Sequence, residues 1–99
     1  MDVKIMDDFN EGNFVVNCCT KEEAVIFINL CYNHGIVFSS GRLTTYWDEY
    51  KDETCYRGEY GDLNYCDIDF YLGEYDMIQF DEFMKHYKGL NFIEFPNID

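Results

Sequence analysis

Residues 20–35, Thr-Lys-Glu-Glu-Ala-Val-Ile-Phe-Ile-Asn-Leu-Cys-Tyr-Asn-His-Gly, decide the fold because they carry a complete set of helix signals. Thr20 is a favourable N-cap, and Glu23 stands three positions later, where it closes a capping box. The side chains that follow at the i, i+3, i+4, i+7 spacing of one helix face are Ala24, Phe27, Ile28 and Cys31. Gly35 is a typical residue just beyond a helix end. The sequence therefore predicts a principal helix over about residues 20–34.

Short segments rich in β-branched and aromatic residues lie around this helix and predict strands. They cover residues 13–18, 36–38, 43–46, 54–57, 63–72, 77–80 and 90–95. A short C-terminal helix is predicted over 82–88, whereas 47–53 fits either a helical turn or a loop. Residues 58–62 form a predicted turn. The first twelve residues are mainly polar, with Ile5, Met6 and Phe9 as possible anchors. This order predicts one acidic α+β domain over residues 1–99, with a small, mainly antiparallel sheet.

Residues 63–72 show the clearest strand alternation in the chain. One predicted face carries Cys66, Ile68, Phe70 and Leu72. The other carries Tyr65, Asp67, Asp69 and Tyr71. Side chains alternate across a strand, so the first set is expected to meet the core and the second to face water or a partner.

The charge of the chain is strongly negative and unevenly distributed. Twenty Asp and Glu oppose seven Lys and Arg among 99 residues, which gives a formal net charge of -13. Residues 44–82 alone carry twelve acids and two bases, a net charge of -10. Such a chain repels nucleic acid and anionic membranes, whereas concentrated acids attract a basic protein surface.

The compartment follows from the cysteines and the apolar segments. Five cysteines make an odd count, there is no signal peptide, and no apolar run is long enough to span a bilayer. We therefore expect a reduced, cytoplasmic protein whose thiols mostly act as small core residues.

The acidic centre of the sequence supplies a candidate partner-binding face. On a strand, Asp67 and Asp69 are about 6.6 Å apart, close to two nucleotide steps along DNA. Tyr and Trp dominate interface hot spots, and carboxylates match the fork of arginine. The candidate residues are Tyr65, Asp67, Asp69, Tyr71, Trp47, Asp48, Glu49, Tyr50, Asp52, Glu53 and Asp76. The alternative is a solvated face whose tyrosines pack across strands.

Catalytic and metal-binding signatures are absent from the sequence. Residues 48–59 have acids in an arrangement like a calcium loop, but Glu53 occupies the position of the required glycine. No phosphate-binding glycine motif and no Cys-x-x-Cys pair occurs, and the two histidines lie in no catalytic motif. We therefore expect no catalytic residues, no cofactor and no metal.

Nucleotide capture is a second hypothesis. The tyrosines could stack on bases, and Arg42, Arg57 and Lys51 are the bases available in the centre of the chain. A homodimer could pool them, although pairing with neighbouring acids is the simpler role for these side chains.

Three segments resemble a known group of proteins. They are the Trp-x-x-Tyr of Trp47 and Tyr50, the Thr-Cys-Tyr-Arg of residues 54–57, and residues 75–83, Tyr-Asp-Met-Ile-Gln-Phe-Asp-Glu-Phe. Over about residues 13–84 the chain resembles small uncharacterised proteins of bacteriophages and mobile elements of low-GC Gram-positive bacteria. The resemblance implies a setting in the cytoplasm of a bacterial host.

Size, charge and this resemblance together suggest an anti-defence role by analogy with anti-CRISPR proteins. The leading hypothesis is a non-enzymatic inhibitor that imitates nucleic acid and occupies the basic groove of a host nucleic-acid-binding protein, for example a CRISPR effector. The alternatives are a nucleotide-sequestering protein and a structural or regulatory phage component.

Overall fold

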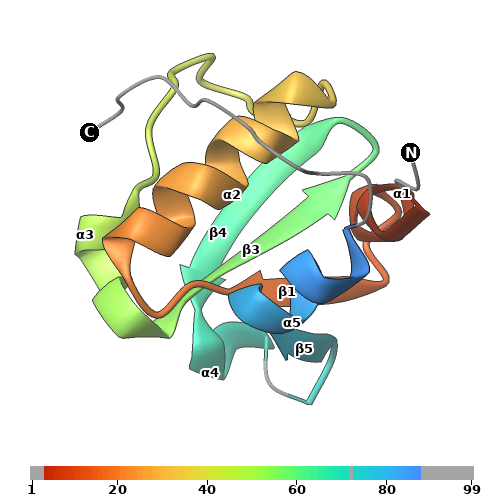
Figure 1. Ribbon diagram of the computed structural model, residues 1–99. Coiled ribbons are helices and arrows are strands. Elements are labelled where there is room, and N and C mark those ends of the chain that lie inside the picture. Colours follow the sequence, from red (N-terminus) through yellow and green to blue (C-terminus); the bar gives the residue numbers. More distant parts are fainter. Residues whose placement is uncertain (1–3, 72, 88–99) are drawn as a thin grey trace.

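The computed structural model describes residues 4–71 and 73–87, and its strands form one mixed sheet (Figure 1). The strands are β1 (Phe14–Asn17), β2 (Val37–Phe38), β3 (Thr54–Glu59), β4 (Asp62–Asp67) and β5 (Asp76–Gln79). Their spatial order is β2-β4-β3-β1-β5. The predicted α+β class is confirmed.

The prediction of a mainly antiparallel sheet is only partly right. β3 pairs antiparallel with both β1 and β4, but the edge strands β2 and β5 pair parallel with β4 and β1. Four strands therefore run in one direction, and β3 alone runs in the other. The helix between β1 and β2 is the reason, because a helical crossover returns the chain parallel to its starting direction.

The predicted principal helix is confirmed as α2 (Lys21–Asn33). The Glu23 N–H donates to Thr20 Oγ1 at 3.1 Å, and the Cys19 N–H donates to Glu23 Oε1 at 3.0 Å, so the capping box is complete. His34 caps the other end and Gly35 follows with φ +79°. The helix lies across one face of the sheet (Figure 1).

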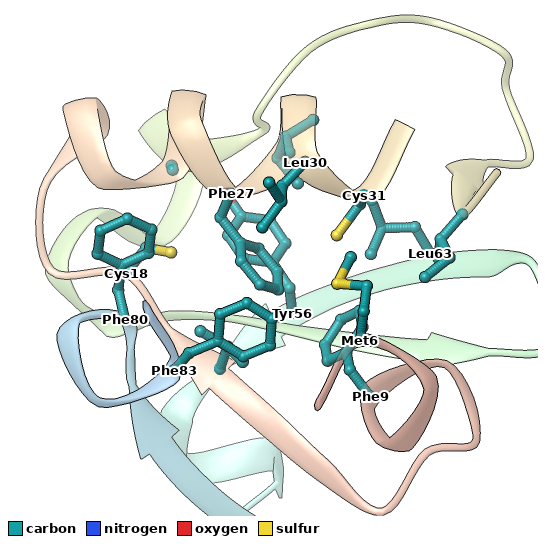
Figure 2. Packing of buried hydrophobic residues seen from close by; sticks show 14 of the residues in the cluster. Met6, Phe9, Cys18, Phe27, Leu30, Cys31, Tyr56, Leu63, Phe80 and Phe83 are labelled. Carbon is teal, nitrogen blue, oxygen red and sulfur yellow. The ribbon is translucent and has the colours of Figure 1, made fainter. Parts of the chain in front are cut away.

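Phe27 of α2 lies at the centre of the main core (Figure 2). Its ring meets Phe9 and Phe83 edge-on, each at 5.1 Å between centroids, and Tyr56 at 5.8 Å. Phe83 belongs to α5 (Phe80–His86), the predicted C-terminal helix, which begins two residues before the predicted start. Phe9 belongs to α1 (Lys4–Asn10), a helix missing from the prediction, which treated this segment as mainly polar.

Two predicted strands are wrong in whole or in part. Residues 43–46 contain no strand, and the segment 47–53 folds as α3 (Trp47–Tyr50) followed by the 3₁₀ helix η1 (Lys51–Glu53). The strand predicted over 63–72 ends at Asp67, and the chain continues as α4 (Ile68–Tyr71). The Phe70 N–H donates to Asp67 Oδ1 at 2.9 Å, so this carboxylate stabilises the first turn of α4.

The second face of the sheet has a core of its own, which α4 helps to cover. Tyr71 is buried there with Val15 and Cys55, and Ile68 packs against them. The predicted strand over 90–95 and the end of the predicted helix at residue 88 lie outside the described residues.

Candidate functional site

Most of the predicted site residues gather at one end of the sheet. Thr54, at the start of β3, is the register partner of Asp67, at the end of β4. The segment α3–η1 leads into β3 and α4 follows β4, so both segments lie at this end of the sheet (Figure 1). We call this region the acidic end and define it as Asp48, Glu49, Asp52, Glu53, Asp67 and Asp69.

Two predicted site residues lie elsewhere. Asp76 pairs with Phe14 at the start of β1 and β5, three residues or about 10 Å along the strands from the end where Asn17 pairs with Gln79. Tyr71 points into the second core and is only 5% exposed. The expected strand face of Tyr65, Asp67, Asp69 and Tyr71 therefore does not exist, because the helix α4 replaces the strand after Asp67.

Three carboxylates of the acidic end have internal partners. Asp48 forms an ion pair with Lys21 at 3.2 Å, and Glu49 accepts a hydrogen bond from the Tyr65 hydroxyl at 2.8 Å. Asp67 accepts from the Phe70 backbone, as described above. These acids help to hold the local structure, and their charges are partly satisfied within the chain.

Asp52, Glu53 and Asp69 differ from the other three. All are exposed, and within residues 4–71 and 73–87 no side-chain hydrogen bond or ion pair involves their carboxylates. An exposed carboxylate without a partner is available to a lysine or arginine of another molecule. The acidic end therefore presents three available charges from two segments, η1 and α4.

The aromatic residues near these acids are mostly engaged with the rest of the fold. The Trp47 indole donates to the Cys18 carbonyl at 3.0 Å and is half-buried, so only part of its ring is open to a partner. Tyr65 stacks on Tyr46 with centroids 4.8 Å apart and lies 6.0 Å from the Tyr50 ring. The tyrosines therefore form a packed cluster behind the acids.

Glu49 also controls the ionisation of this cluster. Burial and the hydrogen bond to Glu49 raise the pKa of Tyr65 to about 12. The adjacent Glu49 carboxylate is the main cause that raises the pKa of Tyr50 to about 12. The negative charge of Glu49 therefore opposes ionisation of both phenols, and the Tyr65 hydroxyl donates to it at 2.8 Å.

The backbone on either side of α3 is unusual. Tyr46 has φ +54°, and Lys51 has φ +53° with ψ -125°, although neither residue is glycine. Such conformations persist where tertiary contacts impose them. Here the Trp47 side chain is bound to Cys18, and Thr54 Oγ1 donates to the Trp47 carbonyl at 3.3 Å. These contacts fix the direction in which α3 and η1 present their acids.

The bases considered for nucleotide capture do not form one site. Arg42 lies in the loop beside α2, where its carbonyl accepts a hydrogen bond from Tyr32. Arg57 packs over the Tyr75 ring at 4.6 Å and pairs with Glu59 at 3.2 Å, on the face opposite α2. Lys51 is at the acidic end. Arg42 and Arg57 therefore lie on opposite faces of the sheet, and Lys51 lies at its acidic end, so one chain does not bring the three bases together.

Catalytic and metal-binding chemistry finds little support in the described part of the chain. No group of three His, Cys, Asp or Glu there could hold a metal ion. Cys19 is the exposed thiol, and burial together with Glu23 and Asp52 raises its pKa, which opposes a reactive thiolate. His34 bonds to the Tyr87 hydroxyl at 2.6 Å and serves the helix end.

Comparisons with family models, curated proteins and solved structures gave no match to this chain. No helix in residues 4–71 and 73–87 is long and apolar enough to cross a membrane. The acidic end is therefore the feature of the chain that points to a function, and the resemblance to phage proteins stays a prediction.

Proposed function

We propose that this chain is a non-enzymatic inhibitor whose acidic end binds the basic nucleic-acid-binding surface of a bacterial protein, in the cytoplasm of a phage-infected cell. The observation that carries the proposal is a set of three exposed carboxylates, those of Asp52, Glu53 and Asp69, which have no side-chain partner among residues 4–71 and 73–87. They lie in the part of the sequence that carries a net charge of -10. A groove that binds phosphates is lined by arginines and lysines, and the same side chains pair with carboxylates.

The form of the imitation differs from the one expected from sequence. The predicted pair of Asp67 and Asp69 on one strand would have copied the spacing of phosphates along a single line. The acids instead come from η1 and α4, at the end of two paired strands. The surface that we propose therefore extends across two segments of the chain.

A pair of triple variants tests the acidic end directly. The test variant combines Asp52→Asn, Glu53→Gln and Asp69→Asn. The control variant combines Asp7→Asn, Glu11→Gln and Asp62→Asn, three exposed acids outside the acidic end. Each triple moves the formal net charge from -13 to -10, so the two variants differ only in where the charge is removed.

The measurement starts with capture of partners from bacterial lysate on the tagged wild-type chain, at low and at high salt. The captured protein is then purified, and its affinity for the three versions is determined. We expect the test triple to weaken binding about tenfold or more and the control triple about threefold or less, because close charge pairs dominate over distant ones. Equal losses for the two triples would contradict the acidic end as the binding surface.

Salt dependence separates the proposed inhibitor from a structural phage component. Binding through charge pairs weakens as ionic strength rises, since the screening length is about 8 Å at physiological salt. A captured partner whose affinity does not change with salt would favour the structural role.

A further inference from the structure

The sheet face opposite α2 exposes apolar side chains around its small core. Phe70 is 64% exposed and Met77 is 37% exposed. Tyr71 belongs to this core, and its ring lies 5.3 Å from that of Phe70 and 5.5 Å from that of Tyr75. Met77 Sδ lies 3.9 Å from Cys55 Sγ, so the exposed methionine also borders this core. We call the surface of Phe70, Tyr75 and Met77 the second-face patch.

Phe70 is exposed because of the way α4 is built. Asp67 fixes the first turn through the Phe70 N–H, and the helix is four residues long. Ile68 and Tyr71, three positions apart, lie on its inward side. The remaining two residues, Asp69 and Phe70, therefore point away from the sheet.

Exposed acidic residues adjoin the second-face patch. Asp69 directly precedes Phe70, and Glu74 directly precedes Tyr75. On this same face, the Arg57 guanidinium already packs on the Tyr75 ring at 4.6 Å. Within the chain itself, this surface therefore already holds a cation over an aromatic ring with carboxylates nearby.

We infer that Phe70 and Asp69 form an arginine-binding element: a guanidinium from the partner packs on the Phe70 ring and pairs with the Asp69 carboxylate. The inference rests on the proposed function and specifies the partner chemistry, because Asp69 belongs to the acidic end. Arginine suits the site better than lysine since its planar guanidinium both stacks on rings and binds a carboxylate with two hydrogen bonds. A second copy is a poor occupant, because it would bring two sets of like charges together.

Two peptides of equal charge, ten arginines and ten lysines, serve as probes of this element. Their dissociation constants are measured by fluorescence anisotropy with wild type, Phe70→Ala and a matched control, Tyr60→Asn. Tyr60 is the most exposed aromatic of the described residues, at 77%, and lies in the β3–β4 turn at the opposite end of β3 from the acidic end. Its φ of +47° is one that asparagine tolerates, so the control removes a ring without adding strain.

We expect wild type to bind the arginine peptide about two- to fivefold more tightly than the lysine peptide, the size of an exposed cation–ring contact. Phe70→Ala should bring this ratio close to one and leave the affinity for the lysine peptide unchanged. Tyr60→Asn should keep the wild-type ratio. A ratio that Phe70→Ala does not change, or that both variants lower equally, overturns the inference.

The failure of this inference is distinguishable from the failure of the proposed function. Suppose that the two peptides bind wild type equally well and that the acidic-end triple variant binds both more weakly. The acidic end is then supported as a binding surface, and the arginine-binding element is rejected. If the acidic-end triple binds both peptides like wild type, the proposed function fails as well. Sedimentation of wild type as a dimer that Phe70→Ala converts to a monomer assigns the patch to a second copy and also overturns the inference.

Discussion

Replacing Lys51 by glycine should stabilise the protein, although it removes a side chain. Lys51 joins α3 to η1 with φ +53° and ψ -125°, a region that glycine occupies freely and other residues do not. Strain of this kind costs roughly 1–3 kcal/mol. Glycine loses roughly 0.5–1 kcal/mol through the greater freedom of its unfolded chain. The net expectation is a gain of about 1 kcal/mol, or about 4–8 °C in Tm for a domain of this size.

The control is Lys51→Ala, which removes the same charge and the same long side chain but keeps the strained backbone. Urea denaturation of the two variants and of wild type then separates the backbone effect from the charge effect. Lys51→Gly should be the more stable of the two variants by about 1 kcal/mol. If it is equal to or less stable than Lys51→Ala, the conformation assigned to Lys51 is not under strain and the reasoning fails.

Two further predictions concern packing and ionisation. Gly58→Ala should destabilise the fold by about 1–3 kcal/mol in urea denaturation, because a Cβ there would lie 2.8 Å from the Phe9 carbonyl oxygen. Gly35→Ala, with no atom within 4 Å but φ +79°, should cost only about 1 kcal/mol. Glu49→Gln should lower the pKa of Tyr65 from about 12, as followed by NMR of labelled tyrosines. Since the folded pKa is the raised one, wild-type stability should fall as the pH rises from about 10 to about 12.

Both predictions have clear contrary outcomes. A Gly58→Ala protein as stable as wild type would mean that α1 does not press against β3 as described. Glu53→Gln is the matched control for ionisation, since Glu53 is an exposed acid of the same segment without a tyrosine partner. If it shifts the Tyr65 pKa as much as Glu49→Gln does, general charge and not the hydrogen bond sets that pKa.

The principal helix was predictable from sequence because its signals are local. A capping box, an apolar stripe and a terminal glycine all act within a few residues of one another, and α2 has the predicted bounds within one residue. The segment 63–72 shows the limit of such patterns. Its alternation fits a strand, but Ile68 and Tyr71 are also spaced like one side of a helical turn. The helix is favoured over the strand because the Phe70 N–H donates to the Asp67 carboxylate and because Tyr71 is buried on the second face.

Gly58 shows another limit. The sequence suggests a turn glycine, yet it lies inside β3, where Phe9 of α1 approaches the backbone too closely for any side chain. That approach depends on a contact between residues almost fifty positions apart. Likewise, the parallel edge strands β2 and β5 depend on where the chain returns after a helix, and no local pattern encodes this.

The sequence by itself determined the charge of the protein, the place of that charge in residues 44–82, the main helix and the α+β class, because each follows from residue types and short-range periodicity. Only the tertiary structure decided which acids remain available. It pairs Asp48 and Glu49 with internal partners, leaves Asp52, Glu53 and Asp69 exposed, and turns Phe70 outward. These outcomes depend on contacts between segments that are far apart in the sequence, and such contacts form and stabilise the structure only when the chain is folded.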